Sequence, residues 1–338
     1  MRPQRLFPAA LAACAALVIV ACESETKPAA PAEAEEAAAP AVCARTSDPA
    51  AAAAFEQAAI ASAQASLGAG SPVIWTLKDE DTTIHILGTV HLLRPDLAWR
   101  SPEIDAAIAA ADTVVFEADT SSPEAGRELM KFVTTQGMFT DGTQLTNLMT
   151  KEDVAVLEEA LKGIDLSIDA IQPMKPWFAA MNLSVMQLTQ EGFDPEAGVE
   201  TTIENEVAAH GATFEYLETV ELQLGAFARL DNCTQVEFLM QTASSMDEGT
   251  ELLDMLVAEW ADGDVAGLGA LMASPEAFGS EAAYNALLKD RNARWVPLIA
   301  DMLETPGTRL VAVGAGHLAG EDSVIAMLRA EGYEVTGP

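Results

Sequence analysis

Most of the strand-like segments in this chain lie in two groups, one near each end of its folded part, with a long helical stretch between them. In the first group, PVIWTLKDEDTTIHILG (72–88) predicts two strands around a polar turn. SPEIDAAIAAAD (101–112) predicts a helix capped by Ser101, and TVVFEA (113–118) predicts a buried strand. A strand, a crossover helix and a second strand in so short a stretch indicate a parallel βαβ unit.

The second group lies at the end of the chain, where strands are predicted at TRLVAVG (308–314) and YEV (333–335) and a helix at 321–332. Neither group alone is large enough to bury a strand on both faces, so we expect the two to build one sheet. The predicted fold class is therefore α/β (α+β), with a central mixed sheet built from N- and C-terminal α/β parts and a large helical insertion in the middle. Further helices are expected at 150–163, 176–191, 195–210 and about 222–303, with one more strand at 213–218.

The first 22 residues have the features of a bacterial lipoprotein signal peptide. Arg2 and Arg5 precede an apolar stretch of sixteen residues, LFPAALAACAALVIVA, which is short for a transmembrane span. That stretch ends in IVAC, which resembles the lipobox, whose cysteine becomes the lipidated first residue. The cysteine here is Cys22; the same pattern at Cys14 would leave a very short apolar core. An uncleaved signal anchor is the alternative.

Residues 23–70 form an Ala/Pro/Glu-rich tether and lead-in, and residues 71–338 are predicted to be a single domain. The lipid on Cys22 would hold that domain at the bacterial cell envelope, on the periplasmic or another extracytoplasmic face. The chain has 52 acidic against 18 basic residues, a net charge of -34. A surface so negative repels phosphate backbones, which argues against nucleic acid as a partner.

Cys43 and Cys233 remain once the cysteines of the signal segment are set aside. In an oxidising envelope compartment such a pair predicts a disulfide, and two unrelated thiols are the alternative. Neither cysteine stands in a Cys-x-x-Cys pattern, which argues against a thiol redox site and against a cysteine-ligated metal.

Two of the four histidines occupy the same position after a predicted strand, in GTVH (88–91) and GAGH (314–317). Each glycine is expected to let the backbone turn sharply, so that His91 and His317 project from loops at one edge of the sheet. Glu117, at the end of VVFE, should reach the same edge. Two histidines and a carboxylate suit a divalent ion that leaves one position for water, which is the chemistry of amide or ester hydrolysis.

The alternative is that both histidines only organise turns. His85 lies inside a strand and is expected to be structural, and His210 is expected to cap a helix. The sequence contains no Gly-x-Ser-x-Gly elbow and no His-Glu-x-x-His motif, which excludes ordinary serine hydrolases and zincins.

Seven blocks, in order along residues 72–336, resemble the TraB/GumN family. They are LGTVHLL, VVFEAD, KPWFAAM, GVETTIENEVAAHG, YLETVELQL, RNARW and VAVGAGHLAGEDSVIAMLRAEGYEV. The family includes the Tiki proteins, which are metal-dependent peptidases, and bacterial proteins of unclear role. It is similar in fold to ChaN-like haem-binding and erythromycin-esterase-like proteins.

The resemblance implies that His91 and His317, with Glu117 beside them, form the metal site. The sequence does not name the divalent ion, for which zinc, manganese and cobalt are the options. Glu117 or Glu218 would act as the catalytic carboxylate. Arg291 and Asn292 of RNARW would bind substrate or another ligand. The substrate would be a peptide or another envelope ligand, and a haem-binding or non-catalytic ligand-binding protein is the alternative. The chain has Glu200 where family members often carry aspartate, and no role is assigned to it.

Overall fold

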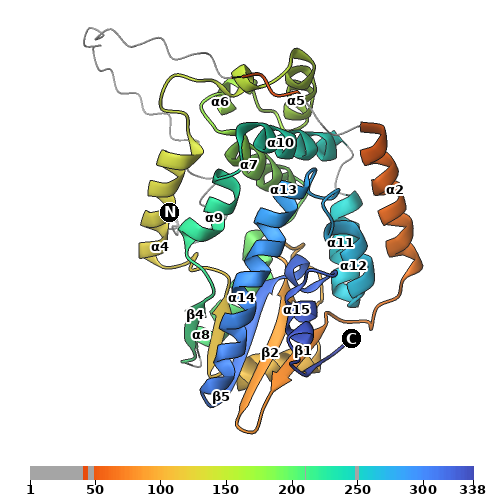
Figure 1. The fold of residues 1–338 in the computed structure, drawn as a ribbon, viewed down its shortest axis with the longest axis vertical. Helices are drawn as coiled ribbons and strands as arrows, with labels where there is room; N and C mark the ends of the chain where they lie inside the picture. Colours follow the sequence, from red (N-terminus) through yellow and green to blue (C-terminus); the bar gives the residue numbers. More distant parts are fainter. Residues whose placement is uncertain (1–40, 45–48, 210, 248–250) are drawn as a thin grey trace, which may run out of the picture.

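The computed structural model describes residues 41–44, 49–209, 211–247 and 251–338, within which six strands form one mixed sheet (Figure 1). The order across the sheet is β4-β3-β5-β2-β1-β6. The strands are β1 (Ile74–Lys78), β2 (Thr82–Thr89), β3 (Thr113–Phe116), β4 (Thr213–Tyr216), β5 (Gly307–Gly314) and β6 (Val335–Thr336). β4, β3, β5 and β2 run parallel, and β1 pairs antiparallel with β2 and β6. Because β5 lies between β3 and β2, the prediction of a single sheet built from both ends of the chain is confirmed.

Helices cover both faces of the sheet and fill the region beyond its carboxyl edge (Figure 1). The α-helices are α2 (Pro49–Ala65), α3 (Pro102–Ala110), α4 (Pro123–Phe132), α5 (Lys151–Gly163), α6 (Ile168–Ile171), α7 (Pro176–Gln190), α8 (Val199–Ala208), α9 (Val220–Ala228), α10 (Asn232–Asp247), α11 (Glu251–Asp262), α12 (Val265–Met272), α13 (Glu281–Tyr284), α14 (Asp290–Asp301) and α15 (Val324–Ala330). A π-helical turn, η4 (Asn285–Lys289), joins α13 to α14. The helix predicted at 195–210 is divided into a 3-10 turn, Pro195–Ala197, and α8.

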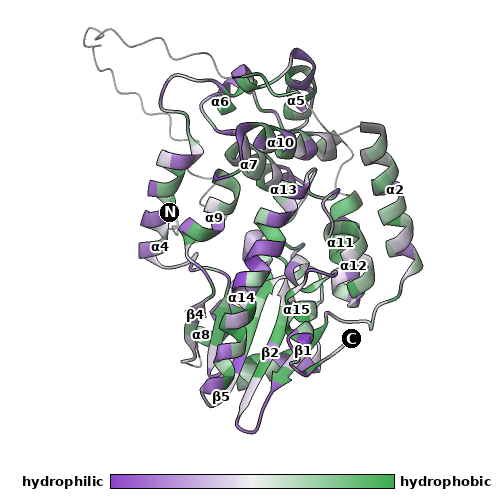
Figure 2. Cartoon of the chain, in the orientation of Figure 1, coloured by the Kyte–Doolittle hydropathy of each residue, from purple (hydrophilic) through white to green (hydrophobic). Residues whose placement is uncertain are grey.

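Neighbouring residues of the central strands pack on opposite faces of the sheet, as the two-residue period of a strand requires. Val115 and Val311 pack with α14 and α15 on one face. Val114 and Leu310 pack with α3 and α8 on the other. Both faces are therefore covered, which explains the runs of apolar residues in β3 and in the second half of β5, and the green in this part of the sheet in Figure 2.

The register of β2 against β5 determines where the two Gly-x-x-His motifs leave the sheet. Gly88 pairs with Val313, and Thr89 pairs with Gly314. The two glycines are thus one register step apart at the carboxyl edge. Neither glycine has a positive φ, so neither uses the backbone conformation that only glycine adopts readily. At Gly314 the missing side chain matters instead, because the Glu117 carboxylate lies close to this residue.

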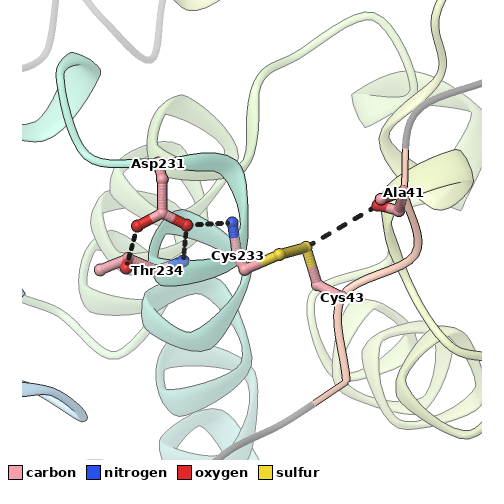
Figure 3. Close-up of a disulfide and its surroundings, with 5 residues drawn as sticks. All are labelled: Ala41, Cys43, Asp231, Cys233 and Thr234. Atoms are coloured by element: carbon pink, nitrogen blue, oxygen red, sulfur yellow. Dashed lines mark hydrogen bonds between the residues drawn. A yellow bond between two sulfur atoms is a disulfide. The ribbon is translucent and has the colours of Figure 1, made fainter.

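The helical insertion has its own hydrophobic core, in which α5, α7 and α10 pack around the fully buried Trp177. A disulfide joins this insertion to the start of the described chain, because Cys43 and Cys233 lie with their sulfur atoms 2.11 Å apart (Figure 3). Cys43 also donates its backbone N–H to Leu148 O at 2.8 Å. Asp231 accepts the backbone N–H groups of Cys233 and Thr234, which orders the first turn of α10.

Part of the segment predicted as tether and lead-in is helical in the structure. It contains α2, whose Ala59 and Ala63 pack against Leu271 of α12. The predicted signal peptide, with Cys22, and the predicted cap His210 lie outside the described residues. Within the described residues, no helix combines the length and apolar character needed to cross a membrane.

We expect the disulfide to contribute substantially to stability, because it closes a loop of 190 residues and so restricts the unfolded chain. Replacing both Cys43 and Cys233 by Ser should lower the free energy of unfolding by about 2–4 kcal/mol. Urea unfolding followed by circular dichroism measures this. A reducing agent should destabilise the wild type and leave the double variant unchanged. Equal sensitivity of the two proteins to reductant would contradict the assignment.

Candidate functional site

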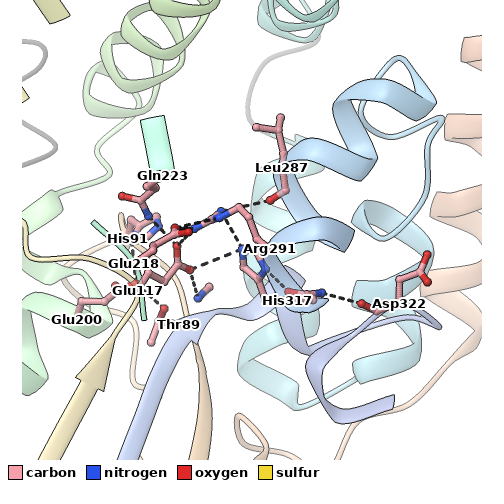
Figure 4. A network of polar contacts seen from close by, with 12 residues as sticks. Thr89, His91, Glu117, Glu200, Glu218, Gln223, Leu287, Arg291, His317 and Asp322 are labelled. Carbon is pink, nitrogen blue, oxygen red and sulfur yellow. Dashed lines mark hydrogen bonds and ion pairs between the residues drawn. The ribbon is translucent and has the colours of Figure 1, made fainter. Parts of the chain in front are cut away.

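Four candidate side chains follow the four parallel strands at their carboxyl edge. His91 follows β2, Glu117 follows β3, Glu218 follows β4 and His317 follows β5. The backbone keeps two of them together, because the N–H of Glu218 donates to the carbonyl oxygen of Glu117 at 2.8 Å. Arg291 enters from α14, and Figure 4 shows its side chain directed toward both carboxylates. The fold thus brings five distant parts of the sequence to one place.

Arg291 is the centre of the resulting network of polar contacts. Its Nη2 donates to Glu117 Oε2 at 2.5 Å and also to Glu218 Oε1, which accepts from Nε at 3.0 Å as well. Its Nη1 donates to Leu287 O at 3.2 Å. The Arg291 side chain is 7% exposed, and those of Glu117 and Glu218 are 9% and 2% exposed. These charges are therefore nearly excluded from water and depend on one another for compensation.

The Glu117 carboxylate accepts two further hydrogen bonds, one at each oxygen. Oε1 accepts the backbone N–H of Gly314 at 2.8 Å, and Oε2 accepts Nε2 of Gln223 at 2.8 Å. A Cβ on residue 314 would lie 3.1 Å from Glu117 Oε1. Glycine at position 314 therefore gives the carboxylate room to approach the backbone of β5, where a Cβ would crowd it.

Hydrogen bonds determine which nitrogen of His317 carries the proton. Asn292 Nδ2 donates to Asp322 O at 2.7 Å, so Asn292 presents Oδ1 to His317 Nδ1, 2.6 Å away. His317 Nδ1 must then be the donor. His317 Nε2 accepts from Arg291 Nη1 at 3.1 Å and lies 3.8 Å from Glu117 Oε1. The unprotonated Nε2 thus faces the two charged groups, while the ring lies 4.3 Å from that of Trp295, centroid to centroid.

His91 is positioned by the start of α8. Its Nδ1 lies 2.8 Å from Glu200 Oε1, which also accepts the hydroxyl of Thr89. The backbone of the same loop is held by Val199 N–H donating to Val90 O at 3.1 Å. A Cβ at position 198 would lie 2.2 Å from His91 O, so glycine is required where α8 approaches this loop.

The local charges set different protonation states for the two histidines. Glu200 raises the pKa of His91 to about 9, although water reaches this side chain, which is 42% exposed, and screens part of the attraction. Burial lowers the pKa of His317 to about 3, so its Nε2 stays unprotonated at neutral pH and can accept from Arg291.

The two carboxylates beside Arg291 differ in the direction of their pKa shifts. Burial alone would raise the pKa of Glu117, but Arg291 and the two histidines hold that pKa well below its usual range. Burial raises the pKa of Glu218, and Arg291 offsets only part of this rise. Glu117 is therefore a firmly ionised acceptor, and Glu218 is the more basic of the two carboxylates.

A cavity of about 430 Å³ opens over this network. Its polar wall includes His91, Glu117, Arg291 and His317, and the rest is mainly apolar side chains of the surrounding helices. A second, smaller cavity of about 80 Å³ begins at the same residues, since His91 and Glu117 line both. The polar network thus lies where two cavities meet, which is a typical position for a ligand site.

The residues present fit a divalent ion in the chemistry of their donor atoms. Each histidine has Nδ1 engaged by a side-chain oxygen, which is the arrangement that orients a metal-ligating histidine through Nε2. His317 Nε2 and Glu117 Oε1, at 3.8 Å, are close enough to share one ion with bonds of ~2.0–2.2 Å. Arg291 contacts His317 Nε2 through Nη1 and the other oxygen of the Glu117 carboxylate, Oε2, through Nη2. The described residues contain no group of three or more His, Cys, Asp or Glu side chains already gathered around one ion position.

The structure therefore brings Glu117, Glu218, Arg291 and His317 into one network and puts His91 on the wall of the same cavity. Asn292, predicted to bind a ligand, is fully buried and orients His317. His85 stays in β2, with Nδ1 3.2 Å from the hydroxyl of Thr76.

Glu200 and Gln223 were not assigned a role from the sequence. Their contacts, with His91 and Glu117, cross more than a hundred residues. The sequence signal that could have pointed to Glu200 is its place in the first turn of the helix that begins after Gly198.

Comparison with known proteins agrees with the family resemblance of the sequence motifs. A model of the TraB/PrgY/gumN family matches residues 73–337. The uncharacterized protein YbaP of Escherichia coli (strain K12) is 25% identical over 256 residues, which cover 72% of this chain and 87% of that protein. YbaP of Shigella flexneri matches to the same extent. No solved structure shows a significant match.

We expect Arg291→Met to lower the free energy of unfolding by about 3–5 kcal/mol, because it leaves Glu117 and Glu218 buried without a counter-charge. Urea unfolding gives the value. Adding Glu218→Gln should recover part of the loss, since it removes one of the two buried charges. Arg127→Met is the control, because Arg127 pairs with Glu124 on the exposed surface of α4 and should matter little. A loss in Arg291→Met no larger than in this control would refute the role of the buried ion pair.

Proposed function

The chain belongs to the TraB/PrgY/gumN family, and on that premise we propose that it is a metal-dependent hydrolase of the cell envelope. It would cleave an amide or ester bond, as a peptidase does, in a peptide or another envelope ligand. The observation that carries the proposal is the pair of atoms His317 Nε2 and Glu117 Oε1. They lie 3.8 Å apart, each oriented by its own hydrogen bonds, on the wall of a cavity that can admit a substrate.

His317 and Glu117 would be the inner ligands of a divalent ion such as zinc, manganese or cobalt, and His91 would be the third. A bound ion of this kind lowers the pKa of its water toward ~7 and polarises a carbonyl group. Asn292 keeps His317 in the tautomer that presents Nε2, and Glu200 orients His91 in the same way.

The two carboxylates suit different tasks. Glu117 is ionised and faces the cavity, which favours a role as a ligand of the metal ion. Glu218 has the higher pKa, which favours acceptance of a proton. Arg291 lines the cavity beside them, and its guanidinium can bind a carbonyl or carboxylate oxygen of the substrate. It also keeps Glu218 next to Glu117.

The proposed place of action is the extracytoplasmic face of a bacterial membrane, with a lipid anchor on Cys22. The disulfide between Cys43 and Cys233 supports an oxidising compartment. The net charge of -34 supports ligands other than nucleic acid.

Elemental analysis of the purified protein tests the metal site directly. We expect about one divalent ion per chain in the wild type and its loss in His317→Ala and Glu117→Gln, because each change removes one of the two facing ligands. His85→Ala is the matched control, since His85 lies in β2 and contacts Thr76; it should keep the ion. Unchanged metal content in both site variants would exclude this site as the ion's position.

The second candidate is a haem-binding or other non-catalytic ligand-binding protein, which the apolar cavity beside His91 and His317 favours. Titration with haem separates the two functions. A Soret band that appears in the wild type and is lost in His91→Ala and His317→Ala would favour the haem-binding function. Hydrolysis of an amide or ester substrate that requires a divalent metal ion, in a protein that gives no Soret band with haem, would favour the hydrolase.

A further inference from the structure

The large cavity is divided sharply into a polar wall and an apolar wall. Among the described residues, its polar and charged side chains come only from the end of β2 and the segments that follow β2 and β3, from Gln223, from Arg291 and from His317. The helices contribute hydrophobic side chains, including Met181 of α7, Leu224 of α9, Leu253 of α11 and Met272 of α12. The apolar wall therefore begins directly beside the candidate reacting groups.

This division indicates what kind of group the cavity accepts. A peptide backbone placed along the apolar wall would have N–H and C=O groups without hydrogen-bond partners, at a cost of roughly 1–3 kcal/mol for each. A hydrocarbon chain carries no such groups and gains free energy from burial. The methionines at Met181 and Met272 are flexible and can adapt to a chain of variable shape.

The size of the cavity points the same way. At about 430 Å³ it lies in the range of roughly 300–1,000 Å³ that encloses a complete small ligand, so a single amino-acid side chain would fill only part of it. The second cavity, of about 80 Å³, is lined by Glu200, Glu204 and Tyr216 and shares His91 and Glu117 with the first. One side of the reacting groups is thus roomy and strongly apolar, and the other is narrow, with a larger share of charged side chains in its lining.

We propose that the large cavity holds the acyl chain of an amphiphilic substrate, whose polar part enters the small cavity. This inference rests on the proposed hydrolase, which would cleave the amide or ester bond joining the two parts. In that reaction the oxygen of water bonds to the acyl carbon and the acyl C–N or C–O bond breaks. One proton from water goes to the leaving amine or alcohol, and a fatty acid remains in the large cavity.

Binding of free fatty acids to the full-length protein tests the acyl site without any need for catalysis. A dansyl-labelled undecanoic acid serves as the fluorescent probe, and saturated fatty acids of four to fourteen carbons compete with it. Affinity should rise by about two- to fourfold for each added methylene until the cavity is full. Equal competition by short and long acids would overturn the proposal.

Leu224→Trp should fill the cavity and weaken binding of dodecanoic acid by about tenfold or more, while binding of butyric acid changes little. The matched control is Leu222→Trp on the same helix, because Leu222 is 43% exposed and is outside the cavity lining. Leu253→Trp narrows the cavity from α11 and keeps the test valid if Leu224→Trp does not fold. If the cavity-filling variants bind dodecanoic acid as tightly as Leu222→Trp does, the large cavity does not hold the acyl chain.

Turnover of 4-nitrophenyl butyrate and 4-nitrophenyl decanoate separates this proposal from the hydrolase on which it rests. Binding that depends on chain length, with no hydrolysis of either ester, would support the acyl site and count against the hydrolase. Hydrolysis of both esters at equal rates, with binding independent of chain length, would support the hydrolase and overturn the acyl site. Faster turnover of the decanoate, lost in Leu224→Trp and kept in Leu222→Trp, is the expected result.

Discussion

The buried ion pair that Arg291 shares with Glu117 and Glu218 is the interaction on which the rest of the site depends. Two carboxylates held next to each other and away from water would repel one another and lose their hydration. A guanidinium between them offsets both effects in part, and its several N–H groups also reach His317 and Leu287 O. This one side chain therefore connects the ends of β3, β4 and β5 to α14.

The histidines are arranged around that ion pair by a second set of contacts. Asn292 fixes the tautomer of His317, and Glu200 holds His91 at Nδ1. Space matters as much as hydrogen bonding, because Gly314 lets the Glu117 carboxylate reach the backbone of β5. The parallel sheet supplies the frame, since neighbouring parallel strands all end at one edge.

The two parts of the fold contribute different surfaces to the cavity. The sheet contributes loops with charged and polar side chains, and the helical insertion contributes an apolar wall. The insertion has its own hydrophobic core around Trp177 and is joined by a disulfide to the segment at Cys43. Because the insertion lies over the carboxyl edge, the polar network forms one wall of a mainly apolar cavity and is not on an open surface.

The sequence by itself determined the strands and most helices, the joining of both chain ends in one sheet, and the family. Hydrophobic period and capping residues are local signals that predict strands and helices. The two Gly-x-x-His motifs and Glu117 also predicted that the candidate site lies at the carboxyl edge of the sheet. Only the tertiary structure decided that Arg291 lies between two carboxylates, that Asn292 serves His317, and that Glu200 holds His91. Those contacts join residues about 25 to 174 positions apart, and no local pattern encodes them. They follow from the way α8 and α14 pack against the sheet, because packing alone sets the distance between charges that are far apart in the chain.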